Sequence, residues 1–407
     1  MNPGRAIADL RDLHRLTGGL DGARRVAWTD EWERARQFLL DRLEELPVTV
    51  ERDAAGNLWA LLEGDSDEIV AIGSHVDSVP SGGWLDGTLG VFGALEALRA
   101  VAAEGRPARC VALVDWADEE GARFGRSLLG SSAFAGTLDL QAAAKLTDAD
   151  GVALPDAVAA HGVDFDAMGG AGEGRREQLA AYLELHIEQG PVLEADGLAC
   201  GAVLGTFGVE RWKAVFTGRA GHAGSTPMDR RADAGVAAAR AIVALQAVAR
   251  EHGGVGTAGR ADFAPGIVTA VPGRAELLVD QRHLEPAALA AMRAGAEQAF
   301  AGAASEEGCD FAAEPIWRID PVPFHEGLVG AAAEACAEQA GAERRLPSGA
   351  LHDASELAGV CPTTMVFSSS IGGVSHSPRE DTAEGDLERA IAAYGALVRR
   401  VVAEGVP

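Results

Sequence analysis

Hydrophobic positions along the chain recur first at helical spacing and then in short apolar runs. Apolar residues return every three or four positions between residues 3 and 45, which predicts helix. The apolar runs predict strands at 48–51, 58–62, 69–72, 109–116, 182–186 and 363–367. The apolar residues of 90–103 predict a helix. Strands that alternate with helices in this way are typical of an α/β fold with a helix-flanked mixed sheet.

The alternation starts again near residue 209, which indicates a second structural unit. Strands are predicted at 212–216, 266–271, 275–280 and 311–317, and helices at 232–252 and 286–304. These elements make an α+β unit of four strands and two helices. We therefore predict one domain of residues 1–208 and 322–407, with a second domain of residues 209–321 inserted into it.

The composition limits the partners and the compartment. Acidic residues number 61 against 35 basic ones, and the formal net charge of -26 argues against nucleic acid or a membrane surface as partner. Five widely separated cysteines predict buried thiols in a reducing compartment rather than disulfides. The N-terminal sequence lacks an apolar signal core, and no apolar segment is long enough to span a bilayer, so we expect a cytoplasmic protein.

Residues that can bind a metal follow the predicted strand at 69–72. His75, Asp77 and Asp86 lie there in a Gly-rich stretch, and imidazole nitrogens and carboxylate oxygens both bind divalent cations. Asp77 is close enough to accept the second ring N–H of His75 and fix its tautomer. The alternative interpretation is a solvated turn in which the Asp side chains bond the local backbone.

Three further strand ends carry the same kind of side chain. Asp118, Glu119 and Glu120 follow the strand that ends at 116, His186 ends the strand at 182–186, and His376 follows the strand that ends at 367. Adjacent carboxylates repel one another, which favours a nearby cation, and a Glu pair can supply one ligand and one general base. Each motif alone also fits an acidic surface loop or a satisfied polar histidine. Together they predict a metal centre, because ligands collect at strand ends in α/β sheets.

The motifs around these residues resemble the amidohydrolase branch of the M20 metallopeptidase family, which contains N-carbamoyl-L-amino-acid hydrolases, allantoate amidohydrolases and β-ureidopropionases. The similarity extends from residue 5 to the C-terminus. Its motifs are GSHVDSVP from Gly73, GGWLDG from Gly82, EEGARFG from Glu119, LGS from Leu129, HIEQGP from His186, GRAGHAGSTPM from Gly218 and GGVSHSP from Gly372. The HIEQGP run favours this branch over the peptidases.

The resemblance implies two divalent metal ions per subunit, and mixed His and carboxylate ligands suit zinc, manganese, cobalt or nickel alike. Asp86 matches a ligand that bridges both ions, and Glu119 matches the general base that activates water and then protonates the leaving nitrogen. The full set that matches the ligands is His75, Asp86 and His186 for one ion, and Asp86, Glu120 and His376 for the other.

The resemblance also implies residues that contact the substrate. His222 is expected to reach the active site of a partner subunit and stabilise an oxyanion, in a homodimer formed through the inserted domain. Arg282 matches an arginine that grips a substrate carboxylate, although a surface strand end would also explain it. Gln189 and Gly349 match further positions near the substrate.

Two departures from the family pattern leave the substrate open. Thr269 stands where the branch usually has Asn, and its hydroxyl cannot make the paired hydrogen bonds of an amide. Leu351 stands where many members carry Gly, and it adds bulk where Gly permits close approach. Neither change affects the predicted metal ligands.

These observations lead us to expect a metal-dependent hydrolase of a small N-carbamoyl amino acid or related ureido compound. Residues 1–208 and 322–407 would form its catalytic domain, and residues 209–321 a lid and dimerisation domain. An allantoate amidohydrolase and an M20-type dipeptidase or aminoacylase would use the same metals, so only substrate assays separate them. A binding protein with structural metals is a further alternative, against which the presence of Glu119 and every candidate ligand argues.

Overall fold

A nine-stranded mixed sheet is assembled from the two ends of the chain in the computed structural model, which describes residues 1–407. The strand order is β1-β2-β4-β3-β5-β15-β6-β13, and β14 pairs with β6. The strands are β1 (Thr49–Arg52), β2 (Leu58–Leu62), β3 (Ser66–His75), β4 (Arg109–Trp116), β5 (Leu179–Ile187), β6 (Cys200–Thr206), β13 (Val322–Pro323), β14 (Arg345–Ser348) and β15 (Thr363–Ser368). Strands β4, β3, β5 and β15 run parallel, so their carboxyl ends lie at the same edge of the sheet.

Helices pack against this sheet. Helix α3 contacts β3, β4 and β5, and α12 packs on α3, α10 and α1, whereas α11 contacts β5, β15 and α4. The helices of this part are α1 (Pro3–Thr17), α2 (Asp30–Leu43), α3 (Thr88–Glu104), α4 (Leu129–Ala135), α5 (Leu140–Ala143), α6 (Leu154–Ala160), α7 (Val192–Asp196), α10 (Glu326–Ala340), α11 (Asp353–Leu357) and α12 (Glu384–Glu404), with short 3₁₀ turns η1 (Phe165–Gly170), η2 (Arg176–Gln178) and η4 (Ile371–Gly373). None of the helices is both long and apolar enough to cross a bilayer.

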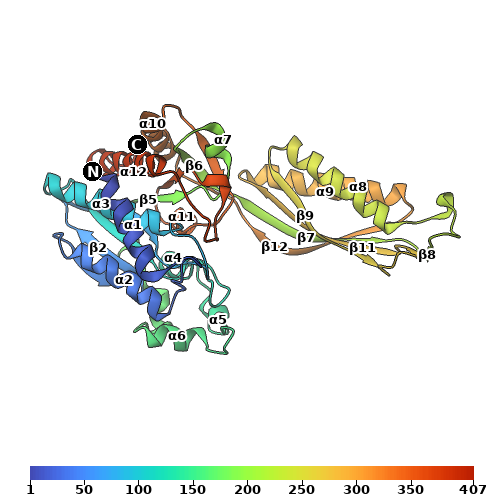
Figure 1. Ribbon diagram of the computed structural model, residues 1–407, viewed down its shortest axis with the longest axis horizontal. Helices are drawn as coiled ribbons and strands as arrows, with labels where there is room; N and C mark the ends of the chain where they lie inside the picture. Colours follow the sequence, from blue (N-terminus) through green and yellow to red (C-terminus); the bar gives the residue numbers. More distant parts are fainter. The chain divides into compact units, whose positions relative to one another are not determined.

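A second sheet, β12-β7-β11-β9, is antiparallel, and α8 and α9 pack on one of its faces (Figure 1). Its elements are β7 (Gly208–Thr217), α8 (Ala234–Glu251), β9 (Val255–Ala264), β11 (Arg274–His283), α9 (Pro286–Glu306) and β12 (Asp310–Ile319), with η3 (Met228–Arg230) before α8. The buried Ala face of α8 meets Trp212, Phe216 and Phe300 in the core. A small separate ribbon pairs β8 (Gly221–His222) with β10 (Ala270–Val271).

The chain divides into two compact units, which match these two sheets in outline. Unit 1 comprises Met1–Leu204 and Phe324–Pro407, and unit 2 comprises Gly205–Pro323. The sequence-based prediction of an α/β fold with a helix-flanked mixed sheet is confirmed. Its buried parallel strands explain why the sequence shows continuous apolar runs rather than alternation.

Two sequence-based element predictions need correction, and some strands were missed. The strand predicted at 266–271 is wrong: residues 265–269 are exposed loop, and only the short β10 follows. The strand beside β11 is instead β9, whose small and polar residues give little hydrophobic signal. The helical stretch at 3–45 is two helices separated by residues 18–29. Strand β6, rich in Gly and Ala, was not predicted at all.

Candidate metal centre

Residues from four parts of unit 1 meet at the carboxyl edge of its parallel strands. His75 is the last residue of β3, His186 is the penultimate residue of β5, and Glu119 and Glu120 lie three and four residues beyond β4. Asp86 lies just before α3. The parallel pairing of β3 with β4 and β5 places these strand ends side by side, so the fold itself brings the side chains together.

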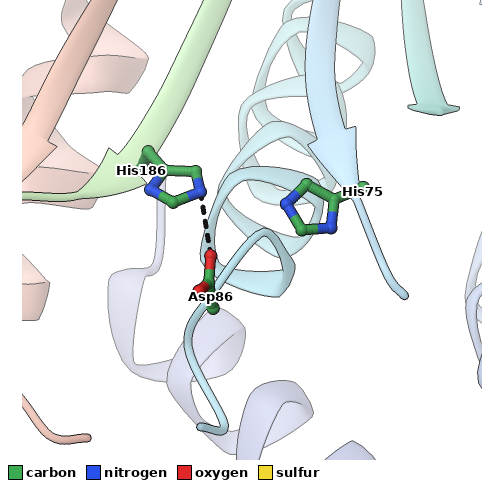
Figure 2. Close-up of side chains that lie close together, drawn as sticks. All are labelled: His75, Asp86 and His186. Atoms are coloured by element: carbon green, nitrogen blue, oxygen red, sulfur yellow. Dashed lines mark ion pairs between the residues drawn. The ribbon is translucent and has the colours of Figure 1, made fainter. Parts of the chain in front are cut away.

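Asp86 lies between two groups of potential metal ligands. In the first, one side-chain ligand atom each from His75, Asp86 and His186 lie within 4.8 Å of one another (Figure 2). In the second, Asp86, Glu120 and His376 meet the same condition. The Asp86 Oδ1 atom is 3.1 Å from Nε2 of His186, whereas Oδ2 is 3.2 Å from Nε2 of His376. Each carboxylate oxygen therefore faces a different histidine, and the two groups share this one carboxylate.

The backbone fixes the tautomers of the two buried histidines. Nδ1 of His75 is 3.1 Å from the carbonyl oxygen of Asp77, and Nδ1 of His186 is 2.9 Å from that of Ile187. A carbonyl oxygen only accepts hydrogen bonds, so Nδ1 carries the proton in the neutral form of both rings. The Nε2 atom of His186 then faces Asp86, and that of His75 lies 3.6 Å from Oε2 of Glu119, so the lone pair of each is available to a metal ion.

Asp77 connects the His75 loop to the loop that carries the glutamates. Its carboxylate accepts the backbone N–H groups of Glu119 and Glu120, at 3.2 and 3.1 Å. The Oδ1 atom is 3.4 Å from Nδ1 of His75, slightly farther than the carbonyl oxygen of Asp77 itself. Sequence reasoning expected the carboxylate to take the ring N–H, and the structure divides that task between carboxylate and carbonyl.

The two glutamates are buried close to these ligands. Burial raises the pKa of Glu119 well above its ordinary value, although the nearby His75 opposes the shift, and Oε2 of Glu119 is 3.6 Å from Nε2 of His75. Burial, reinforced by the charge of Asp86, raises the pKa of Glu120 to about 7. Carboxylates crowded in this way ionise readily only when cations neutralise them. The side chains present therefore fit a centre for divalent cations, which bind imidazole and carboxylate together.

Residues that sequence reasoning missed hold Asp86 in place. Glu380 Oε1 accepts the backbone N–H groups of Leu85 and Asp86, both at 3.0 Å. Ser375 Oγ lies 3.1 Å from both Asp86 Oδ2 and Glu380 Oε2. Glu380 is 294 residues from Asp86 along the chain, so no local spacing could have revealed this contact.

His352 is a further buried histidine beside the centre that sequence reasoning missed. It forms a third close group with Glu184 and His186. Its Nε2 is 2.9 Å from Ser348 Oγ, and its ring also accepts the backbone N–H of Ser355, so both ring nitrogens have protein partners. The ring packs edge-on against His186 with 4.4 Å between centroids. We therefore assign His352 to the support of His186 rather than to a ligand set.

Two of the predicted substrate residues lie in unit 1. Gln189 donates from Nε2 to Asp86 Oδ2 at 3.0 Å and to Ser375 Oγ at 3.1 Å. Gly349 lies between β14 and α11, where an added Cβ would meet no atom within 4 Å. Leu351, in the same connection, is half-buried.

The other three predicted substrate residues lie in unit 2 and form two separate groups. His222 and Thr269 are neighbours, because the backbone N–H of Ala223 donates to the Thr269 carbonyl at 2.8 Å. His222 pairs with Ala270, a few residues before β11 begins at Arg274. Arg282 lies near the other end of β11, where both sides of its guanidinium bind the Asp280 carboxylate. The span from Arg274 to Arg282 on this strand is roughly 26 Å, at the usual rise per residue. One chain therefore does not bring His222 and Arg282 together.

Known proteins match this chain over nearly its whole length. It is 37% identical over 382 residues to an N-carbamoyl-L-amino acid amidohydrolase of Geobacillus stearothermophilus, covering 92% of this chain and 91% of the relative. It is 32% identical to an allantoate amidohydrolase of Bacillus subtilis, with 93% of each chain covered. A solved hydantoinase/carbamoylase family amidase from Burkholderia ambifaria superposes with a TM-score of 0.87 at 36% identity, over 98% of both chains.

The family model for peptidases M20/M25/M40 matches residues 71–400. That range contains every residue of the two ligand groups and most of both units. The resemblance seen in the sequence motifs is thus confirmed by comparisons that cover the whole fold. The chain belongs to the peptidase family M20/M25/M40, a family of hydrolases.

Proposed function

We propose that the protein is a two-metal amidohydrolase that cleaves a C–N amide bond in a small N-carbamoyl amino acid or related ureido compound. The observation that carries the proposal is the position of Asp86, whose two oxygens face His186 and His376 in two adjoining ligand groups. The names of the similar proteins, N-carbamoyl-L-amino acid and allantoate amidohydrolases, support the substrate class.

The ligand groups give each proposed ion three side chains from different parts of the chain. His75, Asp86 and His186 would hold one ion, and Asp86, Glu120 and His376 the other. Zinc, manganese, cobalt or nickel would suit these ligands. When bound, such ions polarise a substrate carbonyl and make water acidic enough to ionise near neutral pH. Gln189 and Ser375 keep the Asp86 carboxylate oriented through hydrogen bonds to Oδ2.

Glu119 would move the protons of the reaction. Its carboxylate belongs to neither ligand group but lies 3.6 Å from Nε2 of His75. It would take a proton from water as the oxygen adds to the carbonyl carbon, and deliver it to the nitrogen as the C–N bond breaks. Its raised pKa, caused mainly by burial, helps it retain the proton between these steps. The products of an N-carbamoyl amino acid would be the amino acid, carbon dioxide and ammonia.

His222 would complete the site from a partner subunit in a homodimer formed through unit 2. Its Nδ1 accepts the backbone N–H groups of Gly224 and Ser225, both at 3.2 Å, so in the neutral ring the proton is on Nε2. The exposed ring thus offers an N–H donor of the kind that stabilises an oxyanion. If His222 and Arg282 both contact one small substrate, their separation within unit 2 requires that they come from different chains.

A panel of substrates tests the proposed activity. Metal-depleted protein is reloaded with Zn²⁺, Mn²⁺, Co²⁺ or Ni²⁺ and offered N-carbamoyl amino acids, allantoate, N-acyl amino acids and dipeptides. We expect metal-dependent release of ammonia from one of the carbamoyl or ureido compounds. Cleavage of dipeptides or N-acyl amino acids without ammonia release would favour the dipeptidase or aminoacylase alternative. Turnover that survives full metal depletion would contradict the two-metal mechanism.

The comparison with the Bacillus subtilis relative favours allantoate as a second candidate substrate. Thr269 supports testing it, because a hydroxyl in place of the usual Asn changes the hydrogen bonds offered to a substrate. The ratio of kcat/KM for allantoate to that for the best N-carbamoyl amino acid decides between the two.

A further inference from the structure

Arg25 is fully buried beside the proposed metal centre. Its Nε donates to the carbonyl of Val76 at 2.8 Å, and its backbone N–H donates to Ser78 Oγ at 3.1 Å. The backbone N–H of Ser78 in turn donates to the Arg25 carbonyl at 3.0 Å. Arg25 is therefore fastened to the loop that leads from His75 toward Asp86. Its two terminal nitrogens, Nη1 and Nη2, have no hydrogen-bond partner in the protein.

Four carboxylates of the centre act on this guanidinium. Burial lowers the pKa of Arg25 to about 10, while the charges of Glu380, Asp77, Asp86 and Glu120 raise it. Arg25 therefore stays protonated at neutral pH. Glu380 has the largest effect of the four, and it is also the residue that holds the backbone N–H groups of Leu85 and Asp86.

Arg25 differs from a buried arginine in an ordinary ion pair, because its terminal nitrogens contact no carboxylate. A buried guanidinium is costly unless nearby negative charges offset its lost hydration. Arg36 meets this need by direct contact, since its Nε is 2.7 Å from the Asp115 carboxylate. The terminal nitrogens of Arg25 make no such contact, so its positive charge acts on several carboxylates at once through the low-dielectric interior.

We propose that Arg25 is the internal counter-charge of the metal centre, which holds the carboxylates Asp86, Glu120 and Glu380 together before metal binds. The inference rests on the proposed function, because it assigns Arg25 a role at the proposed two-metal site. The same charge that relieves repulsion among the carboxylates also repels divalent cations. Arg25 therefore stabilises the metal-free protein and weakens metal binding, and it acts as a positioning residue without touching substrate.

The test compares Arg25→Lys with Arg25→Met, two unbranched side chains that differ in charge. Both lose the guanidinium and its Nε–H, so effects of shape are shared, whereas only the Lys ammonium can still donate to the Val76 carbonyl, and the Glu380 variant below separates charge from that hydrogen bond. Thermal unfolding is measured in chelator and with Mn²⁺. We expect Arg25→Met to have the lower Tm without metal and the larger rise in Tm on addition of Mn²⁺. We also expect its Kd for Mn²⁺ to be on the order of tenfold lower than that of Arg25→Lys, from one unit charge in a partly polar interior.

A second variant shows whether charge is the cause. In the Arg25→Met background, Glu380→Gln removes one of the charges left unbalanced, and the Gln oxygen can still accept the N–H groups of Leu85 and Asp86. We expect it to recover part of the Tm lost without metal. A Tm that falls further would overturn the proposal.

The remaining outcomes are also decisive. Folding of Arg25→Met only in the presence of Mn²⁺ would be the extreme form of the expected result. Equal Mn²⁺-induced rises in Tm for the Lys and Met variants, or loss of folding in both, would show that packing or hydrogen bonding explains Arg25. A wild-type protein that gains no stability from Mn²⁺, Zn²⁺, Co²⁺ or Ni²⁺ would instead remove the metal centre itself, before any variant is compared.

Discussion

Glu119 is the residue on which proton transfer depends in the proposed reaction. A Gln at this position keeps the shape but cannot accept a proton, so we expect Glu119→Gln to lose turnover by about 10²–10⁴-fold. Because Glu119 belongs to neither ligand group, the variant should retain wild-type metal content, measured by elemental analysis. Glu120→Gln is the matched control, since it should lose metal from one site. Comparable turnover by a fully metal-loaded Glu119→Gln would remove Glu119 from the mechanism.

Asp77 supports both loops that carry candidate metal ligands, and its charge matters to both. In Asp77→Asn, one carboxylate oxygen becomes an N–H donor that would face the backbone N–H of Glu119 or Glu120. We expect metal affinity to fall by about 10- to 100-fold, as for other residues that orient ligands. Competition with a chromophoric chelator measures the change. The exposed Asp150→Asn is the control and should bind metal as the wild type does; an unchanged affinity in Asp77→Asn would contradict the role.

Single residues were predictable from the sequence only where local signals marked them. His75 and His186 stand at the ends of apolar runs, and the chemistry of their side chains suggested metal binding. Glu380 and Arg25 carry no such mark, because each acts on groups that are distant in sequence and partly on backbone atoms. The motif resemblance supplied the division of roles between Glu119 and its neighbours, which composition and spacing left open.

Helix α3 packs on the sheet at Gly90, where there is no room for a side chain. A Cβ at this position would lie 2.4 Å from the carbonyl oxygen of Leu185 and 2.5 Å from Cβ of Ser74. We expect Gly90→Ala to lower the free energy of unfolding by about 1–3 kcal/mol, as overpacking does, despite the better helix propensity of Ala. It should also weaken metal binding, because Ser74 and Leu185 adjoin His75 and His186.

Gly330 in α10 provides the matched control for Gly90. An added Cβ there meets no atom within 4 Å, so Gly330→Ala should raise the free energy of unfolding by up to about 1 kcal/mol. Urea unfolding of both variants, with chelator present, compares the two helices directly. A Gly90→Ala protein as stable as Gly330→Ala would show that α3 can move away from the sheet without cost.

At the level of elements, the buried strands were the easiest to predict from the sequence, because burial is what makes their residues apolar. Strands β3, β4 and β5 are buried for most of their length and produce apolar runs that are easily recognised. Strand β9 is largely exposed, and small or charged residues fill it, so its pattern resembled a loop. The apolar residues Ile267 and Val268 suggested a strand instead, yet these residues are 59% and 96% exposed. Hydrophobicity without burial therefore misplaced the strand.

At the scale of the whole molecule, the restart of strand and helix alternation indicated the inserted unit, but nothing local showed how its residues are spaced. The separation of His222 from Arg282 follows from the register of β11 with β7, in which Arg274 pairs with Thr217 and Arg282 with Val209. Pairing register between strands that are distant in sequence is set by the folded sheet. The two-chain active site stays a prediction from the resemblance, and the separation of these two residues within unit 2 makes it testable.

Mixed dimers test the two-chain site directly. His222→Ala and Glu119→Gln chains, each inactive alone, are unfolded and refolded together or exchanged, and heterodimers are isolated with two different affinity tags. If His222 acts across the dimer, one site of each heterodimer has an intact Glu119 and an intact His222 from the other chain. A random mixture should then recover about a quarter of wild-type activity, because half the dimers are mixed and half their sites are complete. If His222 acts within its own chain, both sites of every heterodimer carry a defect, and purified heterodimers will be inactive.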